Sequence, residues 1–283
     1  MSQVRVVTDS TADIPADLRK ALNIEMVPLK VHFGTETYRD SVDMGSAAFF
    51  EKLASVSSLP TTSQPSPVEF METYKRLAEE GDNPILSIHL SSHMSGTYQS
   101  ALLAQSMLED TVNLTVFDSL TASYGIGMLA VTAAEAAKEG KSRDEIVSML
   151  ETIRREQKIY FLVDTLEYLQ KGGRIGKAAA LLGSLLNIKP ILSISDDGEV
   201  FSVDKVRGQK KAMARIMELL KSDYGDRPLH VTVAHANNIP YAEEMSVLLK
   251  EHFTIQSLNY AEIGPVVGTH AGPGAVAAFV RPA

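Results

Sequence analysis

The sequence predicts an α/β protein of two domains, and two observations lead to this prediction. In the first half, short apolar strands alternate with helices, and repeated strand–helix units build a parallel sheet that helices cover on both faces. In the second half, a hairpin turn at Asp197 and Gly198 joins two strands, which favours a mixed sheet. We therefore expect a parallel-sheet α/β/α domain over 1–155 and a mixed-sheet α/β domain over 156–283, with the boundary at the polar stretch 154–157.

The first half contains apolar runs of strand length that helical patterns separate. The apolar runs predict strands over 4–10, 24–34, 83–90 and 113–119. The patterns between and after them predict helices over 10–23, 43–55, 67–80, 95–108, 124–140 and 142–157. Several of these helices begin at Ser, Asp or Pro, and two end at Gly81 and Gly140, where such residues act as caps.

The second half has a different pattern. A strand that begins at Lys158 and a short helix lead into a glycine-rich basic turn at 172–177. The remaining predicted elements are an apolar helix over 178–186, the hairpin over 190–206, a helix over 209–221, a strand over 229–236, a helix over 240–251 and a closing strand pattern over 255–280.

Three hydroxyl-rich turns follow predicted strands, namely "TDST" (8–11), "HLSSHMSGT" (89–97) and "FDSLTAS" (117–123). In a parallel sheet such turns meet at the carboxyl edge of the strands, which is where ligands bind. A fourth donor-rich turn, "TTSQPS" (61–66), contains a proline that restricts its backbone. The convergence of these turns predicts a ligand site, and it carries more weight than any one of them.

Composition and pattern argue against several classes of function. The formal net charge of −8 at pH 7 argues against broad nucleic-acid binding, and the absence of cysteine excludes disulfides and thiolate sites. His89 and His93 flank a turn, and no Glu completes a zinc-binding His-Glu-x-x-His pattern, so we expect no metal and no other cofactor. There is neither a signal-peptide core nor an apolar run of spanning length, so we expect a cytoplasmic protein without a membrane span.

Positive charge is concentrated in one region of this acidic chain. Residues 165–215 contain nine Lys or Arg and five Asp or Glu. Such a region suggests an anionic ligand group or an acidic partner surface. A solvated helix face is the simpler alternative, and the sequence leaves both open.

The turn at 89–97 leaves two chemistries open, a serine nucleophile and an anion-binding helix start. A nucleophile elbow has the pattern Gly-x-Ser-x-Gly, whereas the residues around Ser95 read Ser-His-Met-Ser-Gly. A serine hydrolase that acts on lipid esters through Ser95, with His270 or His93 as the base, is therefore the alternative hypothesis. Free N–H groups at a helix start, together with the neighbouring hydroxyls, favour an anion.

Seven motifs, in order from one end of the chain to the other, resemble those of the DegV family of bacterial fatty-acid-binding proteins. They are "VTDSTADIP", "TTSQPSP", "LSSHMSGTYQSA", "VFDSLTASYGIG", "LEYLQKGGRIG", "LLNIKPIL" and "GTHAGPGA". The resemblance implies two α/β domains that enclose a long acyl chain between them. The implied ligand is a long-chain fatty acid such as palmitate.

The resemblance also implies which residues hold the fatty-acid carboxylate. At the matching positions these are Thr62, Ser95 with the Gly96 backbone, and His270. Ser92 and Ser119, in two of the polar turns, are secondary candidates. Because a carboxylate withdrawn from water needs several hydrogen-bond donors, side chains of this kind suit the role.

The motif "LEYLQKGGRIG" places Arg174 near the headgroup or at a contact with a partner. The resemblance implies that the chain is a carrier subunit rather than an enzyme, and that a separate ATP-dependent fatty acid kinase makes acyl phosphate for phospholipid synthesis. In agreement, "GGRIGK" (172–177) is one residue short of a phosphate-binding loop and lacks the Ser or Thr after its lysine. A transient contact with a membrane would suit such a carrier.

Overall fold

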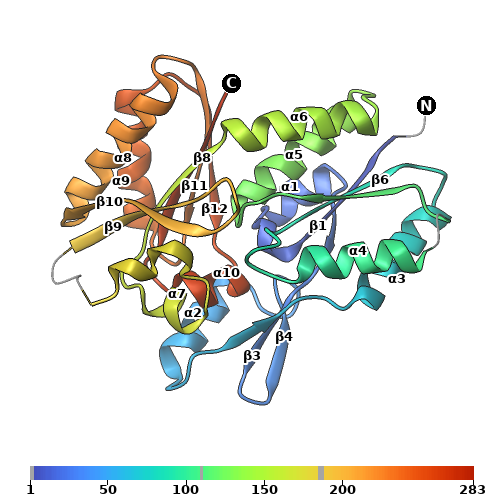
Figure 1. Ribbon diagram of the computed structural model, residues 1–283, viewed down its shortest axis with the longest axis horizontal. Helices are drawn as coiled ribbons and strands as arrows, with labels where there is room; N and C mark the ends of the chain where they lie inside the picture. Colours follow the sequence, from blue (N-terminus) through green and yellow to red (C-terminus); the bar gives the residue numbers. More distant parts are fainter. Residues whose placement is uncertain (1–2, 109–110, 184–187) are drawn as a thin grey trace.

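The structure is a computed structural model that describes residues 3–108, 111–183 and 188–283. Two α/β units lie side by side, each built on its own sheet, and a small third sheet projects from beneath them (Figure 1). The N-terminal sheet is parallel and the C-terminal sheet is mixed, so the predicted fold class is confirmed.

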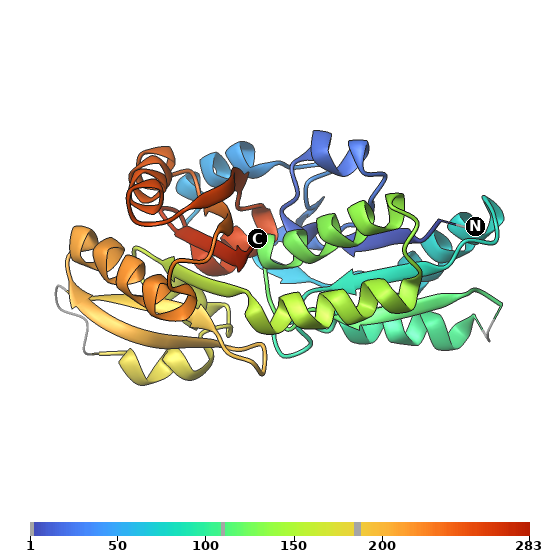
Figure 2. The same cartoon turned by 90° about the horizontal axis from the view of Figure 1, so that it is seen from above.

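The N-terminal sheet has the strand order β2-β1-β6-β7 and is parallel throughout. Its strands are β1 (Arg5–Asp9), β2 (Glu25–Val27), β6 (Ile85–His89) and β7 (Leu114–Asp118). Helices α3 (Pro67–Glu79) and α4 (Thr97–Met107) cover one face, and α5 (Tyr124–Lys138) and α6 (Arg143–Glu156) cover the other (Figure 2). Neighbouring residues of β1 point to opposite faces, because Val6 packs beneath α5 and α6 whereas Val7 packs beneath α3 and α4.

The carboxyl ends of β1, β6 and β7 meet at one edge of this sheet, as the sequence predicted.

The turn after β1 forms a 3-10 helix (Ser10–Ala12), and α1 (Ala16–Ala21) begins only after Pro15. The single helix predicted over 10–23 is therefore divided in two. Asp13, in the left-handed conformation with a φ of 50°, makes the break between the two pieces.

The strand predicted over 24–34 is also divided. Its first part is β2 of the parallel sheet, and its second part is β3 (Lys30–Phe33), which belongs to the small antiparallel sheet. The division falls at Pro28 and Leu29, because proline has no N–H to continue a ladder. The other strands of the small sheet are β4 (Glu36–Arg39) and β5 (Thr61–Ser63), and α2 (Ser46–Ser55) lies between them in the chain.

The C-terminal sheet has the order β10-β9-β8-β13-β11-β12, and only the pair β11 and β12 is parallel. Its strands are β8 (Lys158–Leu162), β9 (Ile188–Ile194), β10 (Val200–Arg207), β11 (Leu229–His235), β12 (Ile255–Glu262) and β13 (Val276–Pro282). Helices α8 (Gln209–Tyr224) and α9 (Ile239–His252) cover one face. The predicted hairpin is confirmed as β9 and β10, with Gly198 at a φ of 81° in its turn.

The other face of the C-terminal sheet carries shorter elements. These are α7 (Glu167–Lys171), the 3-10 helix η2 (Gly176–Leu181) and α10 (Pro265–Ala271). The helix predicted over 178–186 is wrong in its first part, which is a 3-10 helix, and residues 184–187 lie outside the described residues. At Gly176 a Cβ atom would lie 2.4 Å from the Val200 carbonyl oxygen, so η2 packs directly on the backbone of β10.

One hydrophobic core joins segments from the two ends of the chain. It contains Phe49 and Phe50 of α2 together with Val266 of α10 and Phe279 of β13. The short helix α10 packs against α2, β3 and β5 as well as against α7. Because α10 lies between the two units, it is one of the elements through which the C-terminal chain contacts the N-terminal one.

Candidate functional site

A cavity lies between the carboxyl edge of the parallel sheet and the face of the C-terminal sheet that carries α7, η2 and α10. Its atom-free space, including the open mouth, amounts to about 940 Å³. The turns after β1, β6 and β7 contribute Thr11, Leu90 and Ser123, so the site lies at the edge that the sequence predicted. Strands β8 and β13 and helix α10 form the opposite wall.

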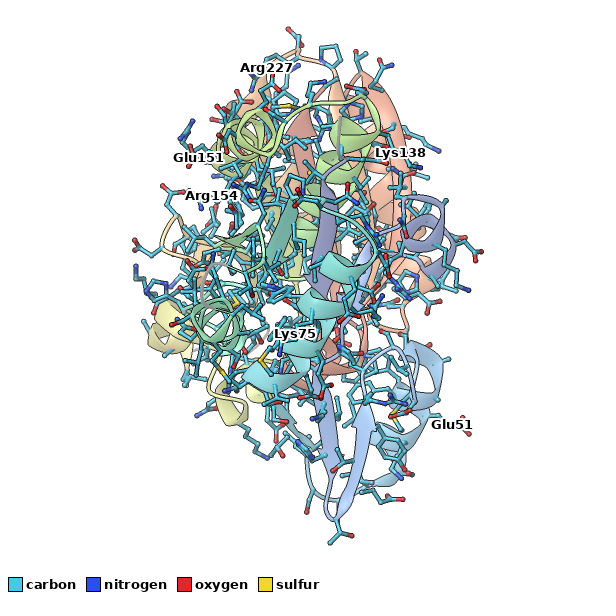
Figure 3. All side chains as sticks on the ribbon, turned by 90° about the vertical axis from the view of Figure 1, so that its right-hand side faces the viewer. Glu51, Lys75, Lys138, Glu151, Arg154 and Arg227 are labelled. Atoms are coloured by element: carbon cyan, nitrogen blue, oxygen red, sulfur yellow. The ribbon has the colours of Figure 1, made fainter. Side chains whose placement is uncertain are left out.

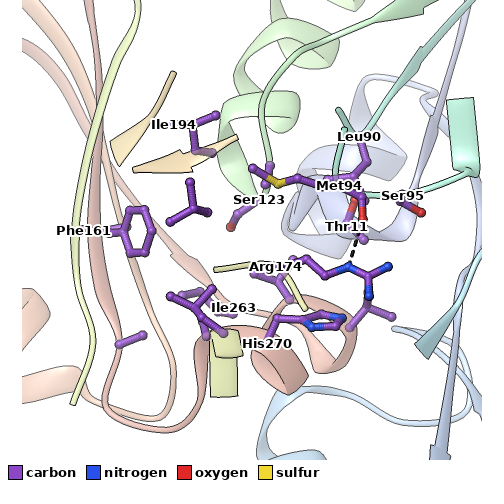
Figure 4. A pocket seen from close by; sticks show the side chains of 18 of the residues that line it. Thr11, Leu90, Met94, Ser95, Ser123, Phe161, Arg174, Ile194, Ile263 and His270 are labelled. Atoms are coloured by element: carbon purple, nitrogen blue, oxygen red, sulfur yellow. Dashed lines mark hydrogen bonds between the residues drawn. The ribbon is translucent and has the colours of Figure 1, made fainter. Parts of the chain in front are cut away.

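The two ends of the cavity differ in chemistry. Figure 4 shows the apolar side chains of Phe161 and Ile194 toward one end, and Arg174, His270 and Ser95 toward the other. Thr62, on β5, also lines the cavity. An apolar space with polar groups gathered at one end is suited to an amphipathic ligand with a single polar head.

Thr62 and His270 meet at the cavity although 208 residues separate them in the chain. The Thr62 Oγ1 and His270 Nε2 atoms are 3.0 Å apart, and His270 Nδ1 is buried without a hydrogen-bond partner among the described residues. Burial, together with the smaller effect of the positive charge of Arg174, lowers the pKa of His270 to about 4. The imidazole is therefore neutral at neutral pH.

The unpaired nitrogen decides how this pair is protonated. If the proton were on Nδ1, a buried N–H would lack an acceptor, which is the costlier arrangement. With the proton on Nε2, His270 donates to Thr62 Oγ1, and the Thr62 hydroxyl keeps its own proton. Thr62 is then free to donate a hydrogen bond to a ligand in the cavity.

The glycine-rich turn after α7 makes room for this histidine. A Cβ atom at Gly172 would lie 2.2 Å from His270 Nδ1, so only glycine allows the ring to occupy its position. Two residues later, Arg174 donates from Nε to the Met94 carbonyl oxygen at 3.0 Å and from Nη1 to the Gly172 carbonyl oxygen at 2.8 Å. These bonds fix the guanidinium against neutral acceptors, so its positive charge remains available to an anionic group in the cavity.

The serines of the turn at 89–97 have different positions. Ser91 is buried and donates to the Gly198 carbonyl oxygen at 2.8 Å, and the Ser92 N–H donates to Asp118 Oδ1 at 3.2 Å. Ser95 lines the cavity, and its Oγ is 2.9 Å from Thr97 Oγ1. Ser95 is therefore the serine of this turn that a ligand in the cavity would meet.

Gly96 is the N-cap of α4. A Cβ atom at Gly96 would lie 2.8 Å from Gln64 Nε2, so glycine allows the turn at 61–66 to approach the start of α4. Ser119 is fully buried and its hydroxyl points to the Thr121 carbonyl oxygen at 3.4 Å. Neither Ser92 nor Ser119 is among the described residues that line the cavity.

The hydrogen bonds of Ser95 do not support a hydrolase. Its Oγ is paired with Thr97, and His270 is paired with Thr62 instead of a serine. A Ser-His-Asp series does exist elsewhere: Ser87 Oγ is 2.6 Å from His89 Nε2, and His89 Nδ1 is 3.0 Å from Asp9 Oδ2. All three side chains are fully buried, so this series is closed to substrates and stabilises the sheet.

Several lining residues were not singled out from the sequence. Thr11 and Ser123 belong to the predicted turns, but nothing in the sequence distinguishes them from their neighbours. The apolar wall from β8 and β13 has no sequence signal, because a strand residue that faces a cavity has the same composition as one that faces the core.

Residues 3–108, 111–183 and 188–283 contain neither a candidate membrane span nor a candidate metal site. No helix in these ranges is both long and apolar enough to cross a membrane. In the same ranges, no group of three or more His, Asp or Glu side chains is placed to hold a metal ion.

The structure is a two-domain α/β fold with a cavity between its two sheets, and this cavity is apolar at one end and polar at the other. The chain belongs to the DegV family, because residues 3–283 match the family model described as "Uncharacterised protein, DegV family". It is 40% identical over 275 residues to Protein DegV of Bacillus subtilis, covering 96% of this chain and 97% of the relative. It is also 40% identical over 277 residues to a DegV domain-containing protein of Halalkalibacterium halodurans, covering 98% and 97% of the two chains.

Solved structures of DegV proteins resemble this chain over nearly its whole length. One is a DegV family protein from Thermus thermophilus, which is described as binding fatty acid. Its structure matches this chain with a TM-score of 0.93 at 35% sequence identity, and the match covers 99% of this chain and 100% of that one. DegV of Bacillus subtilis, described as a fatty acid binding protein, has a TM-score of 0.88 and 38% identity, and the match covers both chains completely at 100%.

Proposed function

We propose that this chain binds a long-chain fatty acid, such as palmitate, in the cavity between its two domains. The observation that carries this proposal is the division of the cavity into an apolar length and one polar end formed by Thr62, Ser95, Arg174 and His270. The DegV structures from Thermus thermophilus and Bacillus subtilis, both described as binding fatty acids, support it.

In this proposal the polar end holds the carboxylate. Withdrawal of a carboxylate from water is costly unless several donors replace the lost water molecules. The Thr62 hydroxyl supplies one donor, because its oxygen already accepts from His270. The Ser95 hydroxyl supplies another when its oxygen accepts from the Thr97 hydroxyl. The Arg174 guanidinium adds a positive charge, which strengthens such hydrogen bonds.

The acyl chain supplies most of the binding free energy. Each buried methylene contributes about 0.8 kcal/mol, so a sixteen-carbon chain supplies on the order of 10 kcal/mol before the cost of ordering is subtracted. The side chains of Phe161, Ile194 and Phe279 offer the apolar surface that this requires. We therefore expect affinity to depend more on chain length than on any single polar contact.

We further propose that the bound carboxylate is presented to a separate kinase, where a carboxylate oxygen attacks the γ-phosphorus of ATP and ADP leaves. A basic surface supports this part of the proposal. Lys205 and Arg207 at the end of β10, and Lys210 and Lys211 at the start of α8, are all exposed. Such a surface suits an acidic partner and would speed encounter with it.

Lipid identification tests the first part. Native mass spectrometry of the purified protein is expected to detect one fatty acid per chain, and the delipidated protein is expected to bind added palmitate. Repeated spectra of the empty protein, together with no palmitate binding after delipidation, would refute the proposed ligand.

Charge reversal tests the second part. The double variant Lys210→Glu and Lys211→Glu is expected to weaken binding to the kinase and to slow acyl-phosphate formation, while palmitate binding stays unchanged. The matched control is Lys75→Glu, an exposed lysine on α3 on the face that Figure 3 shows. Equal kinase rates for all three proteins would argue against this docking surface.

A further inference from the structure

Asp13 connects three segments of the molecule around the cavity without lining it. It lies in the turn after β1, is 8% exposed, and lines a second cavity. Its Oδ1 accepts a hydrogen bond from the Gly264 N–H at 3.0 Å, and its Oδ2 accepts one from the Ser123 hydroxyl. One carboxyl group thus joins the β1 turn, the turn before α5 and the turn before α10.

We call the two hydrogen bonds of Asp13 a bridge, with one arm to Ser123 and one to Gly264. The Ser123 arm reaches the ligand cavity directly. Ser123 lines the cavity and precedes α5 with a φ of 53° and a ψ of −141°, a conformation that is unfavourable for any residue except glycine. Such a backbone persists only where its surroundings hold it. The hydrogen bond to Asp13 holds the side chain of this strained residue in place.

The Gly264 arm reaches the opposite wall. Gly264 is the N-cap of α10, the helix whose His270 pairs with Thr62. A Cβ atom at Gly264 would lie 2.8 Å from Asp13 Oδ1, so glycine at this position lets the carboxyl group reach the helix start. The direction of α10, and with it the position of His270, therefore depends on the contact with Asp13.

We propose that Asp13 is a positioning residue for ligand binding: it aligns Ser123 with the start of α10, and so aligns the two walls of the cavity, without touching the ligand. This inference rests on the proposed function, because it explains how a site for the carboxylate is assembled from two domains. Asp13 therefore helps to assemble the site, and it does not contact the ligand.

The surroundings of Asp13 indicate that the bridge does not need a negative charge. Burial raises the pKa of Asp13 well above its usual value, and the nearby carboxylates of Asp40 and Asp9 raise it further. Asparagine has the same shape and tolerates the left-handed backbone. Its side-chain oxygen can accept from the Gly264 N–H, and its amide can donate to Ser123 Oγ.

Three variants separate positioning from general stabilisation. Asp13→Asn keeps both arms of the bridge, Asp13→Gly removes the side chain but suits the φ of 50°, and Ser123→Ala removes one arm. We expect palmitate affinity to stay within about threefold of wild type in Asp13→Asn and to fall about tenfold in Asp13→Gly. The double variant Asp13→Gly and Ser123→Ala should lose less palmitate binding free energy than the sum of the two single variants. The reason is that both changes break the hydrogen bond between Asp13 and Ser123.

Hydrogen exchange of α10 gives a readout that does not depend on ligand. Asp13→Gly should speed exchange at 265–271 in the unliganded protein, whereas Asp13→Asn should not. If wild type binds no palmitate, the proposed function fails, and the exchange rates still decide the role of Asp13.

Three outcomes would overturn the inference. In the first, Asp13→Gly lowers the melting temperature but leaves palmitate affinity and the hydrogen exchange of 265–271 as in wild type. Asp13 would then have a purely structural role. The second is an Asp13→Asn variant as weak as Asp13→Gly. The third is fully additive losses in the double variant. If Asp13→Gly does not fold, Ser123→Ala carries the test: unchanged affinity in that variant would count against the bridge.

Discussion

At the scale of single residues, the site depends on a neutral histidine that directs a hydroxyl group. His270 is neutral because burial and Arg174 disfavour its charged form, and its proton on Nε2 occupies the oxygen of Thr62. The sequence resemblance assigned both residues to the carboxylate. Which of the two donates to the other depends on the unpaired Nδ1 of His270. This nitrogen has no partner because Gly172 packs against the ring.

The hydroxyl of Thr62 can be tested by substitution with an isosteric apolar residue. Thr62→Val is expected to weaken palmitate binding by about tenfold to a hundredfold, because a hydrogen bond to a charged group contributes about 1.5–3 kcal/mol. Thr62→Ser keeps the hydroxyl and is the matched control, with affinity close to wild type. Displacement of a fluorescent fatty acid measures both, and equal affinity of the valine variant and wild type would remove Thr62 from the headgroup site.

A second residue, Asp40, predicts how stability depends on pH. Burial raises the pKa of Asp40, hydrogen bonds from neighbouring groups such as Ser41 offset part of this rise, and the resulting pKa is about 6. The folded state therefore binds an extra proton between about pH 4 and pH 6, and the stability from this group falls as pH rises through that window.

Substitution of Asp40 removes this titration. The wild type is expected to lose about 1 kcal/mol of its free energy of unfolding between pH 5 and pH 7.5 through this group, whereas Asp40→Asn is not. The difference between variant and wild type should therefore shift by that amount in favour of the variant. Denaturant unfolding at several pH values measures it. Parallel pH profiles for the two proteins would contradict the assignment of a raised pKa to Asp40.

At the scale of elements, the sequence predicted those that local patterns determine. The strands that end at Asp9, His89 and Asp118 and the polar turns after them follow from alternating apolar runs and capping residues, and their meeting at one edge follows from parallel pairing. The single strand predicted over 24–34 is two strands in two sheets, because an apolar run does not show that the chain leaves the parallel sheet at Pro28. The helix over 178–186 was wrong in its first part because apolar composition without a clear period does not separate an α-helix from a 3-10 helix.

The glycine-rich turn after α7 is the element whose role is easiest to test. Gly172→Ala would place a Cβ atom 2.2 Å from His270 Nδ1, so the ring must move away from Thr62. We expect palmitate affinity to fall about tenfold or more, since the donor arrangement at the carboxylate is lost. Gly45→Ala, where a Cβ atom meets nothing within 4 Å, is the matched control and should bind as wild type. Unchanged affinity in Gly172→Ala would show that the position of His270 is not needed.

At the scale of the whole molecule, the site forms only where distant parts of the chain meet. Thr62 comes from the small antiparallel sheet, Ser95 from the turn between β6 and α4, and His270 from a helix near the carboxyl terminus. No local pattern predicts that α10 packs between α2 and the C-terminal sheet. The sequence resemblance could name the three residues, whereas their geometry depends on long-range packing around Phe49 and Val266.

A ligand held between two domains should stabilise both of them. Palmitate at about 100 times its dissociation constant is expected to add about 2.7 kcal/mol to the free energy of unfolding, because it binds the folded state and not the unfolded chain. For a protein of 283 residues this corresponds to a rise in melting temperature of about 5 °C. Calorimetry of the delipidated protein with and without palmitate measures the rise. Hexadecanol has the same chain without the carboxylate, so it should stabilise less, and an equal rise with both would place the headgroup outside the Thr62 and His270 site.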